Sequence, residues 1–538
     1  MTKQLNIIAV DLTPVLPGGE NGGAKIFVLE LLQYLAKMQP KTQFVLLTQA
    51  DSHKELALLD HPNVRRLMIV GSNGVEQSVI RLPSVIKRFT DRLCRLVKRG
   101  GKKIMLSSHS TLLRNMQVDL LFCPFTAPTY FEPGIPTVCT IHDLQYKTYP
   151  EFFSAEDVNH RNRVFVEACK RSTAIAFVSE YSRQVAISYG ELQSNSITTI
   201  HHRIAQRITA KVNGNKAIMA QLNLIRQRYL IYPANFWKHK NHEMLLTAFG
   251  MARQMGLAAD IKLVCTGAPG QRQLWLKKAV ESMQLSDCIV FPGYLPEAEL
   301  GTLLTNSAAM VFPSLYEGFG MPIIEAMAAG VPVACSNTTS LPEVAGSAAI
   351  QFDPRIPSQI AEAIIILVQN EALRTQLIQV GLQRATEFSD TGRMATEYWA
   401  LFQHALVNVK HENLLAGVYA DGWVGPSLTI YLGPTTEAKT LEIEFLLPQW
   451  LPEPFLLFQI IQGGKKQGEP LVFDRGTCAT LSIPLALAGE NYQINITPTF
   501  VPIHTRHGAD HRELSAMLQR CFLINPCGQN IDLLDNIY

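Results

Sequence analysis

Short, uninterrupted apolar runs alternate with amphipathic helical patterns over the first 400 residues. Apolar runs without alternation are typical of strands whose parallel sheet is covered by helices on both faces. Two series of such runs follow one another, the first at 6–10, 44–48, 119–123, 136–141 and 174–178, and the second at 229–233, 261–266, 289–291, 310–312 and 333–335. Repeated strand–helix units predict doubly wound α/β folds. We therefore expect a Rossmann-like domain over 1–210 and another over 211–410, facing each other across a cleft.

The hydrophobic pattern changes after about residue 412. In 440–447, Leu441, Ile443, Phe445 and Leu447 alternate with polar side chains, which is typical of a strand with one buried face. Similar short runs occur at 427–432, 455–462, 479–486, 492–497 and 520–524. We expect an antiparallel, sandwich-like accessory domain over 411–538.

Composition narrows the class of protein. A net charge of +3 argues against a polycation built for nucleic acid. No apolar run reaches the ~18 residues of a spanning helix, and the N-terminus lacks a signal-peptide layout. The ten cysteines stand singly, which favours neither a disulfide framework nor a metal cluster. We expect a cytoplasmic protein that binds no nucleic acid.

Residues 81–103 form a basic segment, with nine Lys or Arg residues against Asp91 alone. Apolar side chains recur there at three- and four-residue steps, so the pattern predicts an amphipathic helix that can lie on an anionic membrane surface, here the inner face. A solvated helix face is the other interpretation. Nucleic acid fits less well, because Phe89 is the only aromatic residue of the segment.

The segment 317–325 (EGFGMPIIE) carries two carboxylates eight positions apart, Glu317 and Glu325. It follows a predicted strand and opens a helix. Gly318 and Gly320 allow backbone amides to approach a ligand closely, and the helix N-terminus favours an anion such as a diphosphate. A carboxylate on the helix can accept hydrogen bonds from both hydroxyls of a ribose. A helix-capping acid and a solvated glutamate are the alternative.

Two basic side chains are expected to face the same cleft. Lys240 lies between the first strand and the first helix of the second series, where its ammonium can neutralise a diphosphate leaving group. His142, followed by Asp143, ends a strand of the first series, so a βα-loop would direct it into the cleft. A solvated basic loop and a packed histidine are the alternatives.

A glycine-rich loop, 17–24, follows the first strand, and Gly22 and Gly23 are its candidate ligand contacts. Its spacing is not G-x-G-x-x-G, so the dinucleotide fingerprint is not met. A plain flexible loop is the alternative.

The stretch 312–332 (FPSLYEGFGMPIIEAMAAGVP) resembles the E-x7-E signature of retaining glycosyltransferases of family 4, which have the GT-B fold. The resemblance extends over about residues 5–405. It implies that Glu325 binds the nucleotide ribose and that Glu317 lies beside the donor sugar. The amides around Phe319 and Gly320 would hold the hydroxyls of that sugar.

The same resemblance implies roles for other segments. Lys240 would neutralise the diphosphate, and His142 would bind the donor sugar. Gly22 and Gly23 would lie near the donor phosphate. Residues 291–295, with Tyr294, would line the nucleobase pocket, largely through backbone. Ala234 is a departure, because many relatives carry an arginine there.

The expected activity is transfer of a hexose, with retention, from a nucleotide diphosphate sugar to a saccharide or lipid-linked acceptor in polysaccharide or glycolipid assembly. GDP-mannose is the first expectation for the donor, on the H-K-N and H-D resemblance, while UDP- and ADP-linked hexoses stay open. No D-x-D motif stands out, so we expect no metal or other cofactor. The mechanism expected is a front-face displacement in which the leaving phosphate helps to deprotonate the acceptor.

Three alternatives remain at the level of sequence. A sugar-nucleotide hydrolase or epimerase could share the fold and the phosphate site. A pyridoxal-phosphate phosphorylase could share the fold but needs a Schiff-base lysine. A non-catalytic sugar-binding scaffold could use the tail domain, where Tyr419 and Trp423 would form either a sugar-stacking surface or part of a sandwich core.

Overall fold

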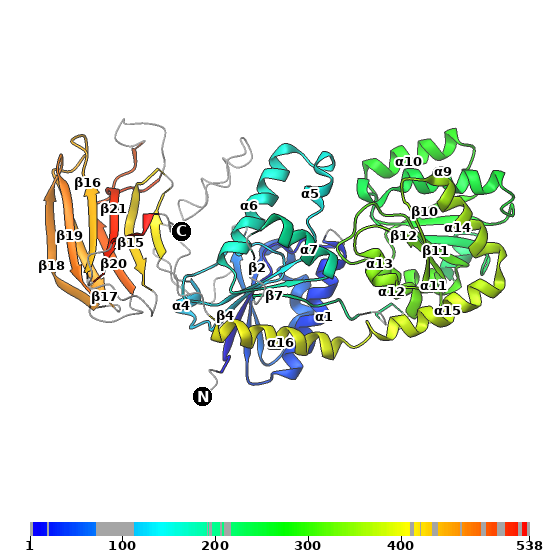
Figure 1. The fold of residues 1–538 in the computed structure, drawn as a ribbon, viewed down its shortest axis with the longest axis horizontal. Coiled ribbons are helices and arrows are strands. Elements are labelled where there is room, and N and C mark those ends of the chain that lie inside the picture. Colours follow the sequence, from blue (N-terminus) through cyan, green and yellow to red (C-terminus); the bar gives the residue numbers. More distant parts are fainter. Residues whose placement is uncertain are drawn as a thin grey trace. The chain divides into compact units, whose positions relative to one another are not determined.

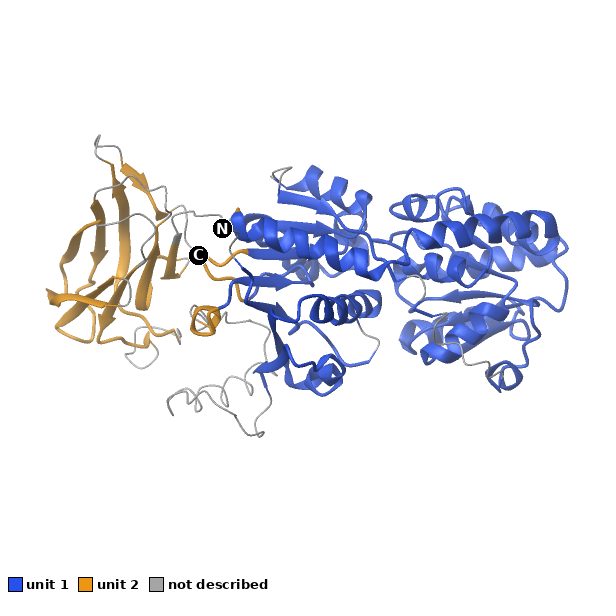
Figure 2. Cartoon of the chain, turned by 90° about the horizontal axis from the view of Figure 1, so that it is seen from below, with its two compact units in different colours: residues 1–78, 118–129, 137–407 blue, residues 79–117, 130–136, 408–538 orange. Residues whose placement is uncertain are grey.

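The structure is a computed structural model. It describes residues 4–18, 21–71, 112–190, 192, 196–204, 207–208, 217–408, 414–419, 421–432, 440–462, 465–485, 491–502, 512–525 and 530–534. Two compact units divide the chain: the first comprises 1–78, 118–129 and 137–407, and the second comprises 79–117, 130–136 and 408–538 (Figure 2). The predicted basic segment 81–103 lies outside the described residues. Within the described ranges, every helix is too short or too polar to cross a membrane.

The first unit contains a seven-stranded parallel sheet in the order β3-β2-β1-β4-β5-β6-β7. Its strands are β1 (Ile7–Asp11), β2 (Gln43–Gln49), β3 (Val64–Val70), β4 (Leu120–Cys123), β5 (Thr137–Ile141), β6 (Ala174–Phe177) and β7 (Ile197–Thr199). The predicted strands are confirmed. The edge strands β3 and β7 were not predicted, because Arg65 and Arg66 interrupt the apolar run of one and the other has only three residues.

Helices cover both faces of this sheet (Figure 1). They are α1 (Gly22–Met38), α2 (Ala50–His53), α5 (Gln145–Thr148), α6 (Ala155–Arg171) and α7 (Glu180–Tyr189), with 3-10 turns at Glu55–Leu59 and Pro150–Phe152. The hydroxyls of Ser154 and Ser179 cap α6 and α7 by accepting a bond from a first-turn N–H group.

A second parallel sheet of the same unit has the order β10-β9-β8-β11-β12-β13. Its strands are β8 (Tyr229–Pro233), β9 (Lys262–Thr266), β10 (Ile289–Gly293), β11 (Ala309–Phe312), β12 (Val333–Ser336) and β13 (Ala349–Phe352). Around it lie α8 (Ala217–Gln221), the 3-10 turn Lys238–Lys240, α9 (His242–Gln254), α10 (Gln271–Ser282), α11 (Glu297–Asn306), α12 (Met321–Ala328), α13 (Leu341–Ala345), α14 (Pro357–Gln369) and α15 (Glu371–Thr386). The two doubly wound sheets confirm the predicted α/β class.

The last helix of the unit, α16 (Thr391–Val407), returns to the first sheet and packs along α1 (Figure 1). The hydroxyls of Tyr398 and Thr140 lie 3.2 Å apart, both buried. The chain therefore crosses between the two Rossmann-like halves twice. The crossings are bonded to each other, because the Thr391 hydroxyl donates to the carbonyl of Arg203 (2.7 Å) and the Arg203 guanidinium donates to the carbonyl of Glu387.

The second unit contains two antiparallel sheets, β14-β15-β20-β17-β18 and β19-β16-β21-β22, which confirm the predicted all-β region. Its elements are α4 (Leu112–Asn115), β14 (Leu414–Val418), β15 (Val424–Tyr431), β16 (Thr440–Leu446), β17 (Phe455–Gln462), β18 (Lys465–Asp474), β19 (Cys478–Pro484), β20 (Asn491–Thr497), β21 (Met517–Ile524) and β22 (Asn530–Asp532). β18 was not predicted, because it is an almost wholly exposed edge strand whose residues do not alternate between apolar and polar.

The aromatic residues of the second unit support the core interpretation. The Trp423 ring lies 5.5 Å from that of Trp450 and 5.7 Å from that of Phe500, and Tyr419 and Trp423 both pack against the buried cluster. The domain bounds 1–210, 211–410 and 411–538 stay predictions.

Candidate active site

The loop between β11 and α12 brings the two Rossmann-like halves into contact. The carbonyl of Gly318 accepts hydrogen bonds from the hydroxyls of Ser179 (2.6 Å) and Ser182 (3.3 Å), which belong to the first half. A Cβ atom on Gly318 would lie 2.0 Å from the carbonyl oxygen of His142. Only glycine therefore permits this approach.

Gly320 shapes the start of α12. Its φ of +106° is in the left-handed region, and a Cβ there would lie 2.6 Å from Leu341 Cδ2. Gly320 is the N-cap, and Pro322 follows in the first turn. This geometry leaves the amide end of α12 at the loop that carries the first carboxylate.

Glu317 and Lys240 form an ion pair, with Lys240 Nζ 2.5 Å from Glu317 Oε1. Each side chain is only 12% exposed. Lys240 ends the 3-10 turn before α9, and its ammonium lies 5.7 Å from the ring centre of Phe312. Two loops of the second half, predicted separately from sequence, thus converge on one point.

His142 follows β5 and is held by its own half. Its Nε2 lies 2.8 Å from the carbonyl oxygen of Pro124. Because a carbonyl can only accept, Nε2 carries the proton. Burial lowers the pKa of His142, so the ring is neutral and its Nδ1 is an acceptor. A neutral acceptor suits a hydroxyl group rather than an anion.

Gly22 and Gly23 were predicted in a loop, but they are the first two residues of α1. Gly22 has a φ of +54°, and a Cβ there would lie 3.7 Å from the Trp237 ring. A Cβ on Gly23 would lie 2.1 Å from Met321 Cε. The structure therefore places both glycines against the loops of the second half, with Gly23 at the first residue of α12.

Glu325 lies on α12 and is engaged by an arginine. Its Oε1 accepts hydrogen bonds from Arg207 Nε (3.0 Å) and Nη2 (2.6 Å), and the side chains are 6% and 7% exposed. Arg207 Nη1 also binds Glu297, at the start of α11. Burial raises the pKa of Glu325, although Arg207 opposes the shift. Arg207 was not predicted, because it belongs to the connector between the halves and to no motif.

Phe319 and Tyr294 differ from the other predicted residues. The Phe319 ring is buried and packs against His202, with ring centres 4.9 Å apart, so its side chain is part of the core. Tyr294 follows β10 and is 61% exposed. Among the described residues, no hydrogen bond or ring contact joins it to Glu317 or Glu325.

Glu343 joins the halves at a second point. Its carboxylate accepts hydrogen bonds from the backbone N–H groups of Glu180 (2.7 Å) and Tyr181 (3.0 Å), at the start of α7. Its Oε1 also lies 2.7 Å from His201 Nε2. Burial opposes ionisation, but these bonds outweigh it and lower the pKa of Glu343. No sequence motif indicated this contact.

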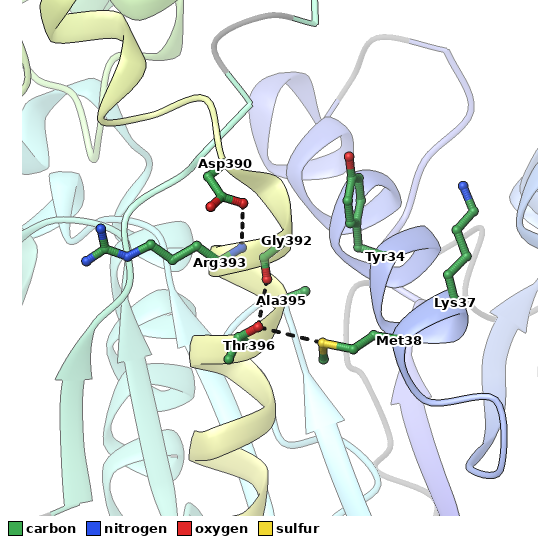
Figure 3. A pocket seen from close by; sticks show the side chains of 8 residues that line it. All are labelled: Tyr34, Lys37, Met38, Asp390, Gly392, Arg393, Ala395 and Thr396. Atoms are coloured by element: carbon green, nitrogen blue, oxygen red, sulfur yellow. Dashed lines mark hydrogen bonds between the residues drawn. The ribbon is translucent and has the colours of Figure 1, made fainter.

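An open groove of about 670 Å³ lies between α1 and α16 (Figure 3). Its lining residues are Tyr34, Lys37, Met38, Asp390, Gly392, Arg393, Ala395 and Thr396. The Thr396 hydroxyl lies 3.7 Å from Met38 Sδ across it. The groove contains none of the predicted site residues. Within the described part of the chain, no three His, Cys, Asp or Glu side chains lie close enough to hold a metal ion.

Solved structures share this fold at low sequence identity. Sucrose-phosphate synthase from Thermosynechococcus elongatus matches with a TM-score of 0.57 and 18% identity over 75% of this chain and 99% of its own. HepE of Anabaena in complex with UDP and glucose matches with a TM-score of 0.55 and 15% identity over 73% and 98%. The two sheets are those of a GT-B glycosyltransferase fold.

Two family models match consecutive parts of the chain. Residues 21–204 match "Glycosyltransferase Family 4", and residues 215–384 match "Glycosyl transferases group 1". The chain belongs to the glycosyltransferases of family 4.

Mannosyltransferases are among its curated relatives. "O-antigen chain mannosyltransferase B" of Escherichia coli is 31% identical over 253 residues, 47% of this chain and 66% of that protein. "O-antigen chain mannosyltransferase RfbU" of Salmonella typhimurium is 25% identical over 263 residues, 48% and 63%. The chain thus spans somewhat less than two thirds of the length of these relatives.

Proposed function

We propose that this chain is a retaining hexosyltransferase that transfers mannose from GDP-mannose to a saccharide or lipid-linked acceptor in the assembly of a surface polysaccharide. Membership of family 4 and the names of the O-antigen relatives support the reaction class and the sugar. The observation that carries the proposal is the ion pair of Glu317 and Lys240, next to Gly318, which lies against the backbone carbonyl of His142.

Lys240 stabilises the departing diphosphate. An ammonium has three N–H donors, and Glu317 takes one of them, so two remain for phosphate oxygens. Glu317 at the same time fixes the direction of the ammonium. The amide end of α12 adds a second favourable interaction with developing negative charge. Together these groups act where a divalent ion acts in other transferases.

The transferred sugar lies between Glu317, the amides at Phe319 and Gly320, and the Nδ1 atom of His142. The Nδ1 atom of His142 accepts a hydrogen bond from a hydroxyl group of that sugar, whose proton stays on the sugar oxygen. Glu325 binds the ribose, and Gly22 and Gly23 approach the phosphates. The nucleobase lies near Tyr294. The leaving phosphate helps to deprotonate the acceptor in a front-face displacement.

The test is a screen of GDP-mannose, UDP-glucose and ADP-glucose by thermal shift, followed by turnover with product analysis. A ligand that binds only the native state raises Tm. The expected result is a rise with GDP-mannose and transfer of mannose to an acceptor saccharide, at an unchanged rate in EDTA. Release of free mannose alone would instead identify a hydrolase, and binding without turnover would identify a sugar-binding scaffold.

We further propose that the basic segment 81–103 attaches the enzyme to the inner face of the cytoplasmic membrane. Its supporting observation is the pattern of nine basic residues with an apolar stripe. Flotation with vesicles rich in anionic lipid should show binding at low salt that decreases as salt increases. An absence of binding at low ionic strength would contradict the idea.

A further inference from the structure

The connector between the two Rossmann-like halves supplies a buried arginine to the proposed ribose site. Arg207 Nε and Nη2 both donate to Oε1 of Glu325, at 3.0 and 2.6 Å, and Nη1 donates to Glu297. The guanidinium is therefore fixed at three of its nitrogens by two carboxylates. Both bonds to Glu325 use the same oxygen, and no described residue donates to Oε2.

Glu325 depends on this arginine for its charge. A buried carboxylate without a partner tends to take up a proton, and Glu325 is 95% buried (5% exposed). Arg207 favours the ionised form, whereas the neighbouring Glu297 disfavours it. An ionised carboxylate can accept from both ribose hydroxyls and binds them more strongly than a neutral carboxyl group, which turns one of its oxygens into a donor.

Charged groups on the helices packed against α12 are engaged elsewhere. Arg384 of α15 donates to the carbonyls of Glu343 and Val344, and the Glu343 carboxylate caps α7. Arg374 of α15 donates to the carbonyls of α14. Among the described residues, Arg207 is thus the cation that balances Glu325.

We propose that Arg207 is a positioning residue, which holds the Glu325 carboxylate by Oε1 and so directs Oε2 to accept the ribose hydroxyls of the nucleotide donor. The inference rests on the proposed function. It assigns a role to the connector, which lies outside the signature from which the site was predicted.

The experiment compares Arg207→Gln, Arg207→Lys and the control Arg228→Gln, which removes an arginine from an exposed ion pair with Asp260. The dissociation constant of GDP and kcat/KM for GDP-mannose are measured from pH 5.5 to 9, with Tm as a check of folding. Arg207→Gln should weaken GDP binding about tenfold at pH 7 and move the acid limb of kcat/KM up by about one pH unit. Arg207→Lys should keep the acid limb of kcat/KM at the wild-type pH and raise KM several-fold. Arg228→Gln should match the wild type in both measurements.

Glu297→Gln is a second, independent variant. Removal of this negative charge should favour ionisation of Glu325, so the acid limb should move to lower pH. It decides the question if Arg207→Gln does not fold, because an unshifted limb in Glu297→Gln would then overturn the proposal.

Other outcomes also overturn it. If kcat/KM of Arg207→Gln falls by the same factor at every pH, the role of Arg207 is purely structural. Tighter GDP binding by Arg207→Gln would show that the guanidinium competes with the ribose. A wild type that neither binds nor turns over a nucleotide sugar would refute the proposed function and this inference with it. An active wild type, together with an Arg207→Gln variant whose pH profile of kcat/KM is not shifted, would refute this inference alone.

Discussion

The ammonium of Lys240 lies 2.5 Å from the carboxylate of Glu317, and both side chains are almost buried. This pair joins the turn before α9 to the loop before α12. It therefore fixes, before any donor binds, the cation that we propose to face the leaving diphosphate. Such preorganisation costs no rearrangement at the moment of reaction.

Lys240→Ala should lower kcat by about 10²–10³-fold, because negative charge on the leaving group grows in the transition state. The donor KM should change less. Steady-state kinetics with GDP-mannose measure both. Lys278→Ala, at an exposed position of α10, is the control and should be unchanged. An unchanged kcat in Lys240→Ala would contradict the proposed role.

Gly318→Ala should separate the two Rossmann-like halves at the site. Its Cβ would meet the carbonyl oxygen of His142 at 2.0 Å, so the loop must move away. We expect kcat/KM to fall by at least about 100-fold, since a displacement of about 1 Å can cost that much. Gly270→Ala is the matched control, because a Cβ there meets nothing within 4 Å. Equal activity of the two variants would show that the contact is not needed.

Glu343→Gln should weaken the second contact between the halves, because it removes the charge that binds two N–H groups of α7. The pKa of Glu343 is lowered in the folded state, so its stabilising effect is complete above the unfolded value of 4.5 and is lost as pH falls below it. The Tm difference between wild type and variant should thus be full at pH 6–7 and shrink in acid. Melting curves from pH 3.5 to 7 measure it, and a pH-independent difference would rule out the charge as the cause.

Asp11→Asn should stabilise the protein at neutral pH. Burial raises the pKa of Asp11 to about 6, although Thr13 bonds lower it, so the folded state loses stability as pH rises from 3.8 to 6. A shift of this size is worth at most about 3 kcal/mol. The gain in Tm should be present at pH 7.5 and vanish near pH 4. Asp51→Asn, at an exposed position, should show no such trend.

The fold was predictable where burial is complete. The first four residues of β1 and of β8 are apolar because helices cover both sheet faces, so their pattern predicted the strands. The sequence pattern did not predict β18, since an exposed edge strand such as Lys465–Asp474 needs no regular apolar pattern. Edge strands form because a neighbour offers hydrogen bonds, which sequence pattern does not encode.

The candidate site shows the same division. Glu317, Gly318, Gly320 and Glu325 belong to one local segment, so their spacing alone indicated a ligand loop. Arg207 reaches Glu325 across 118 positions, and Glu343 reaches the start of α7 across more than 160. Such partners are brought together only by the tertiary fold, and a single chain carries no local signal for them.

The chain crosses twice between the Rossmann-like halves, and this limits how the halves can move relative to each other. Because Arg203 and Thr391 bond the outgoing and returning segments to each other, the halves cannot swivel freely about a single strand of backbone. The halves are then expected to move chiefly by bending at these two bonded segments. Because Lys240 and His142 lie on different halves, a bend at these segments would change the distance between the two side chains.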